Sequence, residues 1–198
     1  GVIQPGEAIV ESRLAQQLGA GIPLVREALI ELEHQGYVQK VPYKGTTVTR
    51  LERGDVEKIF RLRVELESLA IEWAKESVAP ADIEELRTIT RQMKEGAQGL
   101  DLDRFYLNDL AFHRKLWEMS GNEYLVECLE RIVVPLFAFF LMKDRRPRES
   151  YLLSAAQHEK IVEALPRLSK AKLRGLMRDS VSDWRTEVFN AVLPKELD

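Results

Sequence analysis

The chain has 198 residues, of which 45% are hydrophobic and 31% are charged, and its formal net charge at pH 7 is −3. This length fits one large domain or two small ones, and the composition is that of a globular protein with a proper hydrophobic core. The net charge excludes a surface that is positive all over, but it leaves room for a basic surface on one domain.

The sequence gives no sign of membrane association. No apolar run approaches the roughly 20 residues that are needed to span a bilayer, and no segment resembles a signal peptide. The single cysteine, Cys128, excludes an internal disulfide and fits a reducing compartment, so we expect a cytoplasmic protein. Because Cys128 stands in an apolar stretch, we expect its thiol to lie in the core.

Residues 12–34 predict two helices separated by a sharp turn. The first helix is capped by Ser12, ends at Gly19 and turns three apolar residues inward: Leu14, Ala15 and Leu18. Apolar residues of the second helix recur at i, i+3, i+4 and i+7 and form one stripe: Val25, Ala28, Leu29 and Leu32. This is the pattern of a helix-turn-helix, whose second helix enters the major groove of DNA.

A basic hairpin is predicted to follow. β-branched and aromatic residues at 37–41 and 46–50 indicate two strands, joined by a turn at 42–45. Residues 34–50 contain Lys40, Lys44 and Arg50 and no acidic residue. Beside a helix-turn-helix such a hairpin is a wing, whose basic tip suits phosphate contact. The alternative is a small helical subdomain with a solvated hairpin, but the order and spacing of these features favour DNA binding.

Beyond a short linker at 51–54, the apolar period becomes helical. Caps, glycines and prolines divide this region into six helices, at about 55–76, 80–96, 101–120, 123–143, 147–165 and 170–192. We therefore expect a mainly α protein: an N-terminal winged helix-turn-helix with a small β-hairpin wing over residues 1–50, followed over residues 55–198 by an antiparallel six-helix bundle.

Two histidines and an aspartate in this bundle form a candidate metal site. Asp109 and His113 lie four residues apart and so on one face of a helix, and His158 lies in the fifth helix of the bundle. A carboxylate and two imidazoles are ordinary ligands for divalent metals such as zinc or nickel. On spacing alone, the alternative is favoured: a helix-surface pair of Asp109 with His113, and a solvated His158.

The segments LAQQLG, VREALIELEHQGYV and KGTTV resemble the winged-helix domain of GntR-family bacterial transcription regulators. The resemblance implies a homodimer on a two-fold symmetric double-stranded DNA operator. It implies DNA contacts by six residues: Ser12, Arg13, Pro23, Arg26, Lys44 and Gly45. There are two departures. Ile22 replaces an arginine that commonly reads a guanine, and we expect the protein to lack the helix that usually precedes the segment matched by residues 1–10. One alternative is therefore an effector-binding protein that has lost DNA recognition.

The pattern D-x-x-F-H, then SGN, then a helix with a lone histidine is similar to the helical FCD effector domain of the FadR-type branch. Many such domains hold a metal with one aspartate and three histidines. Asp109, His113 and His158 match the first three positions, and Ser180 stands at the fourth, where the family has histidine. Three outcomes stay open. The metal could have three protein ligands, Asp179 or Asp183 could serve as the fourth ligand in place of Ser180, or the pocket could hold an organic effector without metal.

The resemblance also assigns an effector site. Arg63 matches an arginine that often faces the ligand, although an ion pair with Glu67, four residues on, is the alternative. Asn108 adjoins the same site. We expect a repressor that responds to a small carboxylate effector and is not an enzyme. The competing hypothesis is a metal-dependent hydrolytic enzyme in which Asp109, His113 and His158 activate water, which leaves the winged domain unexplained.

Overall fold

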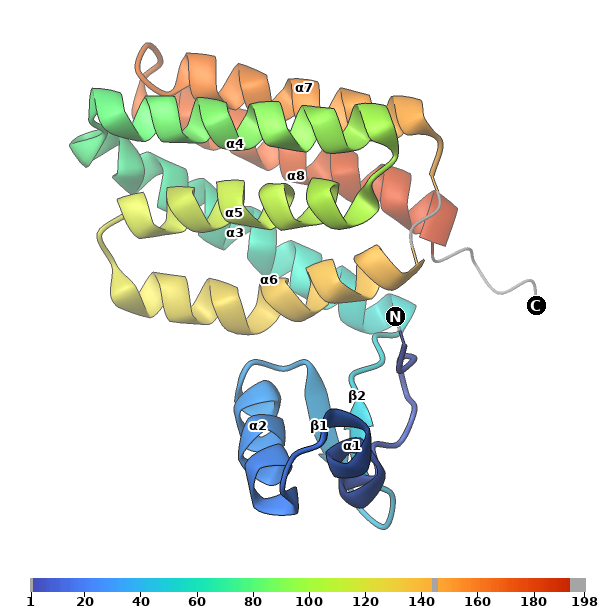
Figure 1. Ribbon diagram of the computed structural model, residues 1–198. Coiled ribbons are helices and arrows are strands. Elements are labelled where there is room, and N and C mark those ends of the chain that lie inside the picture. The colour runs from blue at the N-terminus through green and yellow to red at the C-terminus, as the bar shows by residue number, and fades with distance from the viewer. Residues whose placement is uncertain (1, 144–145, 193–198) are drawn as a thin grey trace.

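The computed structural model of the chain describes residues 2–143 and 146–192, excepting the side chains of residues 187, 188 and 190–192. A small N-terminal domain lies against one side of a larger helical bundle (Figure 1). Over the described residues, no helix is long and apolar enough to cross a membrane.

The N-terminal domain is the expected winged helix-turn-helix. Helices α1 (Glu11–Leu18) and α2 (Ile22–His34) precede the antiparallel strands β1 (Val38–Val41) and β2 (Gly45–Val48). The segment before α1 lies along β2, with backbone hydrogen bonds from the amides of residues 6 and 9 to the carbonyls of residues 48 and 46. One small buried cluster holds the domain together: Ala15, Val25, Leu29 and Val38.

Three details of the predicted helices are wrong. Helix α1 begins at Glu11 after an N-cap at Val10, so Ser12 lies inside the helix and does not cap it. Leu18 is 66% exposed because it is the last residue of α1, where the chain turns away at Gly19. Ala28 is also exposed, since at 100° per residue it falls at the edge of the stripe that Val25 centres.

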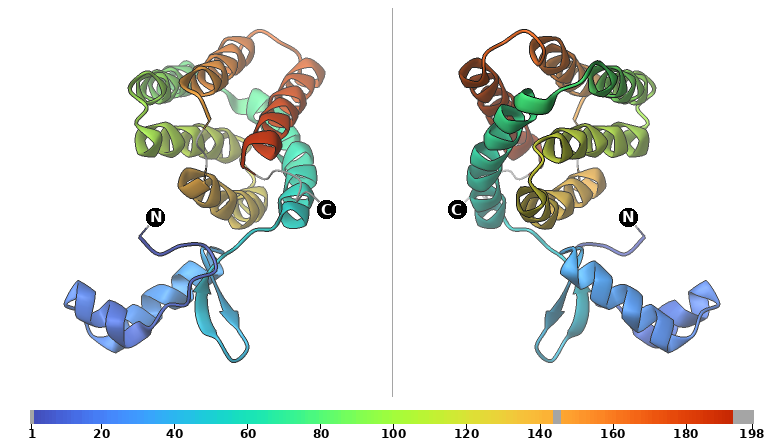
Figure 2. Two further views of the ribbon diagram at one scale, coloured as in Figure 1. Left: turned by 90° about the vertical axis from the view of Figure 1, so that its right-hand side faces the viewer. Right: turned by 90° about the vertical axis from the view of Figure 1, so that its left-hand side faces the viewer.

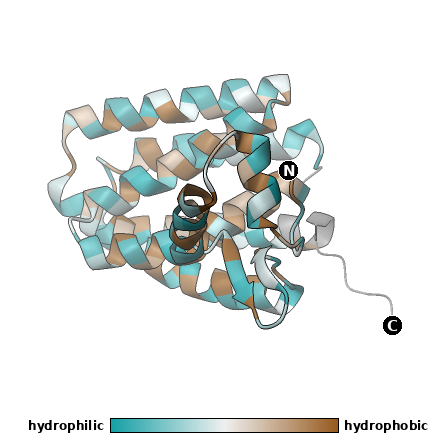
Figure 3. Ribbon diagram, turned by 60° about the horizontal axis from the view of Figure 1, so that its bottom comes forward, coloured by the Kyte–Doolittle hydropathy of each residue, from teal (hydrophilic) through white to brown (hydrophobic). Residues whose placement is uncertain are grey.

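The C-terminal domain contains the six expected helices. They are α3 (Arg53–Ser77), α4 (Pro80–Gly99), α5 (Leu102–Met119), α6 (Glu123–Lys143), α7 (Arg148–Ala164) and α8 (Lys170–Val192). Helix α3 packs on α8 and α5, and α4 packs on α5 and α7 (Figure 2). The helices show both hydrophobic and hydrophilic residues along their length, as amphipathic helices do (Figure 3).

Helix α3 begins at Arg53, two residues before the position that the sequence predicts. The reason lies in its first turn, where the Asp55 carboxylate accepts a hydrogen bond from the Glu52 amide at 3.3 Å. Asp55 is therefore the third residue of the helix, and its side chain accepts from the cap residue Glu52, as in a capping box. Asp55 is not itself the cap. The linker is correspondingly shorter than residues 51–54.

Helix α6 is the bundle helix that faces the N-terminal domain (Figure 1). It contains Pro135, which has no amide hydrogen to donate to the Arg131 carbonyl one turn earlier. Gly36, just after α2, adopts a φ of +82° and lies against this part of α6. Tyr37 packs against the hydrophobic clusters of both domains. The junction is therefore built on α6.

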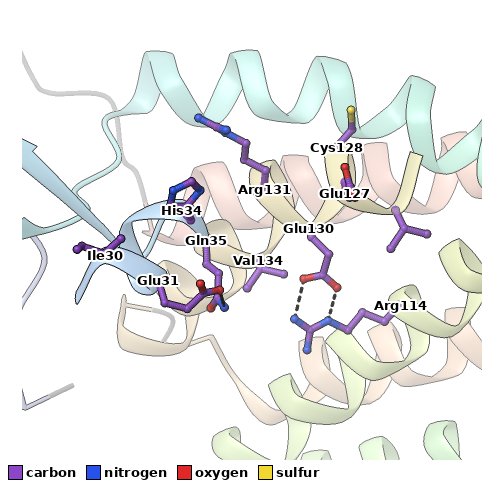
Figure 4. Close-up of a pocket in the computed structure, with 11 residues that line it drawn as sticks. Ile30, Glu31, His34, Gln35, Arg114, Glu127, Cys128, Glu130, Arg131 and Val134 are labelled. Atoms are coloured by element: carbon purple, nitrogen blue, oxygen red, sulfur yellow. Dashed lines mark hydrogen bonds and ion pairs between the residues drawn. The ribbon is translucent and has the colours of Figure 1, made fainter. Parts of the chain in front are cut away.

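Cys128 corrects a further expectation, because its thiol is exposed and does not lie in the core. Its neighbours Leu125 and Leu129 take the buried face of α6. Cys128 instead lines a pocket of about 920 Å³ between α2, α5 and α6 (Figure 4). The Arg114 guanidinium spans the pocket wall to both carboxylate oxygens of Glu130, at 2.6 and 2.7 Å.

Candidate functional site

Five ionisable side chains meet inside the helical bundle. Helix α5 carries Asp109 and His113 one turn apart on its buried face, α7 brings His158, and α3 brings Arg63 and Glu67. Each is at most 5% exposed. Charged groups are rarely buried to this degree without close partners, so the cluster must be held by its own interactions or by a ligand.

Asp109, His113 and His158 point three ligand atoms at one another and could hold a metal ion. Asp109 Oδ1 lies 3.0 Å from His158 Nε2 and 3.5 Å from His113 Nε2, and the two Nε2 atoms are 3.4 Å apart. Ligands bound to one zinc-like ion at 2.0–2.2 Å lie about 2.8–3.6 Å apart, which these separations match. Asp109 Oδ1 is buried without a well-aligned hydrogen bond. The donor set therefore fits a divalent metal.

The hydrogen bonds of the two rings orient both Nε2 atoms toward this centre. His158 Nδ1 lies 2.8 Å from the Ser154 carbonyl oxygen, which can only accept, so Nδ1 carries the proton. Arg63 Nη2 donates to His113 Nε2 at 3.0 Å, so the His113 proton is on Nδ1. That Nδ1 faces Glu67 Oε2 at 2.6 Å, an ion-pair distance without the alignment of a hydrogen bond. Such outer contacts fix the orientation of metal-binding histidines.

The cluster shifts the pKa of its members in opposite directions. Burial acts to raise the pKa of Glu67, but Arg63 and His113 outweigh it and bring that pKa to about 2. Burial likewise opposes the effect of His158 on Asp109, whose pKa is nevertheless lowered. Burial lowers the pKa of His113. Burial also acts to lower the pKa of His158, but Asp109 and the Ser154 carbonyl together outweigh it and raise that pKa. Two carboxylates are therefore anionic beside a neutral His113.

Arg63 forms the ion pair that the sequence offered as the alternative to an effector-binding role. Its Nε donates to Glu67 Oε1 at 2.5 Å, which confirms the ion pair. Its guanidinium carbon also lies 5.0 Å from the ring centroids of both Phe137 and Trp184, beside the histidines. Glu67 belongs to the centre too, although its only signal in the sequence is the four-residue spacing from Arg63.

The other residues expected at or near this centre are less buried than its members. Asn108 is half-buried, and its Nδ2 donates to the Arg104 carbonyl within α5 at 2.8 Å. Asp179 and Asp183 are exposed on α8, which does not favour them as ligands of a buried ion. Ser180, at the fourth family position, is half-buried on the same helix.

All six residues expected to contact DNA are exposed on the N-terminal domain: Ser12, Arg13, Pro23, Arg26, Lys44 and Gly45. Arg26 is paired with Glu11 of α1 through Nε at 3.1 Å and Nη2 at 2.8 Å. Gly45, with a φ of +76°, follows the wing tip. Sequence reasoning passed over Tyr43, which stands fully exposed at that tip with a φ of +66°.

Comparison with known families accounts for both domains. The model for the gntR family of bacterial regulatory proteins matches residues 1–48, and the FCD domain model matches residues 58–183. The chain belongs to the gntR family of bacterial regulatory proteins and carries an FCD domain. The winged domain and the six-helix bundle of this GntR-family chain correspond to these two parts.

Several relatives are similar over much of this GntR-family chain. The HTH-type transcriptional regulator McbR of Escherichia coli K12 is 28% identical over 134 residues, covering 68% of this chain and 61% of McbR. The uncharacterized HTH-type transcriptional regulator YdhC of Bacillus subtilis is 33% identical over 137 residues, covering 67% and 59%. The gluconate operon transcriptional repressor of B. subtilis is 25% identical, covering 100% and 82%. The alignments therefore span about three fifths of the first two relatives.

The solved structure of E. coli McbR/YncC superposes with a TM-score of 0.84 at 22% identity, covering 96% of this chain and 90% of that one, which confirms the fold. The named relatives are transcriptional regulators and not enzymes. This favours a regulator over the hydrolytic enzyme, and it explains why a winged helix-turn-helix precedes the buried centre.

Proposed function

We propose that this GntR-family protein is a cytoplasmic transcription repressor that binds a two-fold symmetric DNA operator as a homodimer and responds to a small carboxylate effector. The observation that carries the proposal is the buried triangle of Asp109, His113 and His158 with Arg63 beside it, in a bundle joined to a winged helix-turn-helix. The relative named as a repressor of a gluconate operon supports repression as the mode of action.

In the bundle, each member of the centre has a role. Asp109, His113 and His158 would hold a zinc or nickel ion, which when bound supplies a Lewis-acid charge that attracts an oxyanion. The Arg63 guanidinium offers a planar fork that matches a carboxylate, and Glu67 anchors that fork through Nε. His113 and His158 are held in the binding tautomer by their Nδ1 contacts.

On the N-terminal domain, Arg26 and Pro23 at the start of α2 would meet base edges and phosphates. Ser12, Arg13, Lys44 and Gly45 would meet the backbone or the minor groove. Their exposure supports this role, and so does the basic character of the wing tip.

Helix α6 connects the two ends of this mechanism. Phe137 lies 5.8 Å from the His113 ring and 5.0 Å from the Arg63 guanidinium. Pro135, two residues earlier on α6, abuts Gly36 of the winged domain. An effector that moves Phe137 would therefore alter the placement of the DNA-binding domain. Regulation follows if the effector binds the free and the DNA-bound protein with different affinity.

Selection from a random double-stranded DNA pool tests this function. We expect enrichment of an inverted repeat with half-sites about one DNA turn apart, bound more weakly as salt rises. Native mass spectrometry of the same sample should show a dimer with one metal per chain. A folded dimer that enriches no sequence would contradict the DNA-binding role and favour lost DNA recognition, whereas a metal-free dimer that takes up neither zinc nor nickel would exclude only the metal.

A further inference from the structure

Two different partners would compete for one nitrogen atom of the buried centre, His113 Nε2. His113 Nε2 accepts a hydrogen bond from Arg63 Nη2 at 3.0 Å, and it is also one corner of the metal-binding triangle. A ring nitrogen has a single lone pair, so it cannot accept from a guanidinium and ligate a metal at the same time. Arg63 is 2% exposed, so no solvent lies between its guanidinium and the metal position.

We propose that the Arg63 guanidinium occupies the cation position of this centre when metal is absent, and that it must leave His113 before a metal is held. The inference rests on the metal site of the proposed function. The guanidinium pairs with the Glu67 carboxylate, and the His113 nitrogen that it contacts lies 3.5 Å from Asp109 Oδ1. A positive group there balances two carboxylates that would otherwise be buried together, as a divalent ion would.

The contacts of Arg63 suit a group that exchanges partners. Its Nε is anchored to Glu67 Oε1 at 2.5 Å, while Nη2 contacts His113. The buried Nη1 has no hydrogen-bond partner among the residues that the structure describes. The guanidinium is therefore incompletely satisfied where it lies. By turning about its Nε contact with Glu67, the guanidinium gives up His113 and donates from both Nη groups to the carboxylate of an effector. Metal uptake and effector binding are therefore linked.

Nickel titration of the full chain, stripped of metal and read against a chelating dye, tests this exchange. Three variants are compared with the wild type: Arg63→Met, the double variant Arg63→Met/Glu67→Gln, and Arg61→Met, an exposed arginine on the same helix. The double variant keeps the net charge of the centre. It leaves no unpaired buried carboxylate at position 67, so it should fold even if Arg63→Met alone does not. Circular dichroism of each variant confirms that it is folded.

If Arg63 holds the cation position, both variants at position 63 bind nickel more tightly than the wild type, by on the order of tenfold or more, because no buried cation has to be displaced. Arg61→Met matches the wild type. Nickel binding that is tighter only in Arg63→Met assigns the effect to net charge and overturns the proposal. Wild-type nickel binding that neither variant exceeds also overturns it, while leaving the metal site intact. If no protein binds nickel, the metal part of the proposed function fails with it.

Discussion

The backbone of Gly36 lies against the ring of Pro135, so closely that a β-carbon at position 36 would stand 2.8 Å from Pro135 Cγ. The same β-carbon would stand 3.4 Å from the Arg131 carbonyl oxygen, which Pro135 cannot hydrogen-bond. A glycine just after α2 and a proline within α6 are thus in direct contact at the junction of the two domains, and each depends on the other's shape.

Gly36→Ala should lower the free energy of unfolding by roughly 1–3 kcal/mol, because it adds a clash to a strained positive φ. Gly121→Ala is the matched control, since Gly121 has a φ of +68° and open space around it. Urea unfolding followed by circular dichroism measures both. Adding Pro135→Ala to Gly36→Ala should recover part of the loss. Equal losses at positions 36 and 121, with no recovery, would show that the contact is unimportant.

Arg26→Ala should weaken binding to the selected operator by about 1–3 kcal/mol, the usual range for a side chain that reads a base edge. Arg91→Ala removes an exposed arginine from the bundle and should leave affinity unchanged. Fluorescence anisotropy with a labelled duplex gives both affinities at one salt concentration. If Arg26→Ala binds as tightly as Arg91→Ala, Arg26 does not read the operator.

Ser180→His should tighten nickel binding, because it restores an imidazole at the position where related domains carry their fourth ligand. Asp183→His places the same ring at an exposed position of α8, three residues on, and should not change nickel affinity. Isothermal titration of the metal-free proteins compares them. An equal response of both variants would mean that α8 does not present position 180 to the triangle.

Acid should destabilise the protein partly through Glu67. Its pKa falls from an ordinary 4.5 to about 2 on folding, so its stabilisation is present above about pH 4.5 and is lost as the pH drops toward 2. Urea unfolding of metal-free protein between pH 6 and 3 should therefore give a smaller loss of stability in Glu67→Gln than in the wild type. Glu84→Gln, at an exposed position, should follow the wild type. Parallel curves for all three proteins would remove Glu67 as a source of acid sensitivity.

Much of the fold could be predicted because local rules and tertiary packing agree. Glycines at the turn, Pro80 at the start of α4 and the change to a helical period all indicate elements that the structure contains. The predictions that failed concern side chains whose burial depends on a neighbouring helix. Leu18 faces outward because α1 ends there, and Cys128 faces outward because Leu125 and Leu129 take the buried face of α6.

The centre was only partly predictable. The spacing of Asp109 and His113 fixes a shared helix face, but the same spacing describes an ordinary surface pair, and only packing decides between the two. The position of His158 opposite them depends on how α7 meets α5, which no local pattern encodes. Glu67 was harder still, since a glutamate four residues after an arginine is common on exposed helices, whereas here the pair is almost fully buried.

The ion pair between Arg26 and Glu11 has a consequence for how such a protein would search a chromosome. A phosphate on unrelated DNA offers Arg26 little more than Glu11 already provides at 2.8 Å, so exchanging one anion for the other yields little binding energy. A base edge with two acceptors in the right place offers more than a single anion does. The pair with Glu11 would therefore make Arg26 favour the operator over unrelated sequence, because only a base edge offers more than the contact that has to be broken.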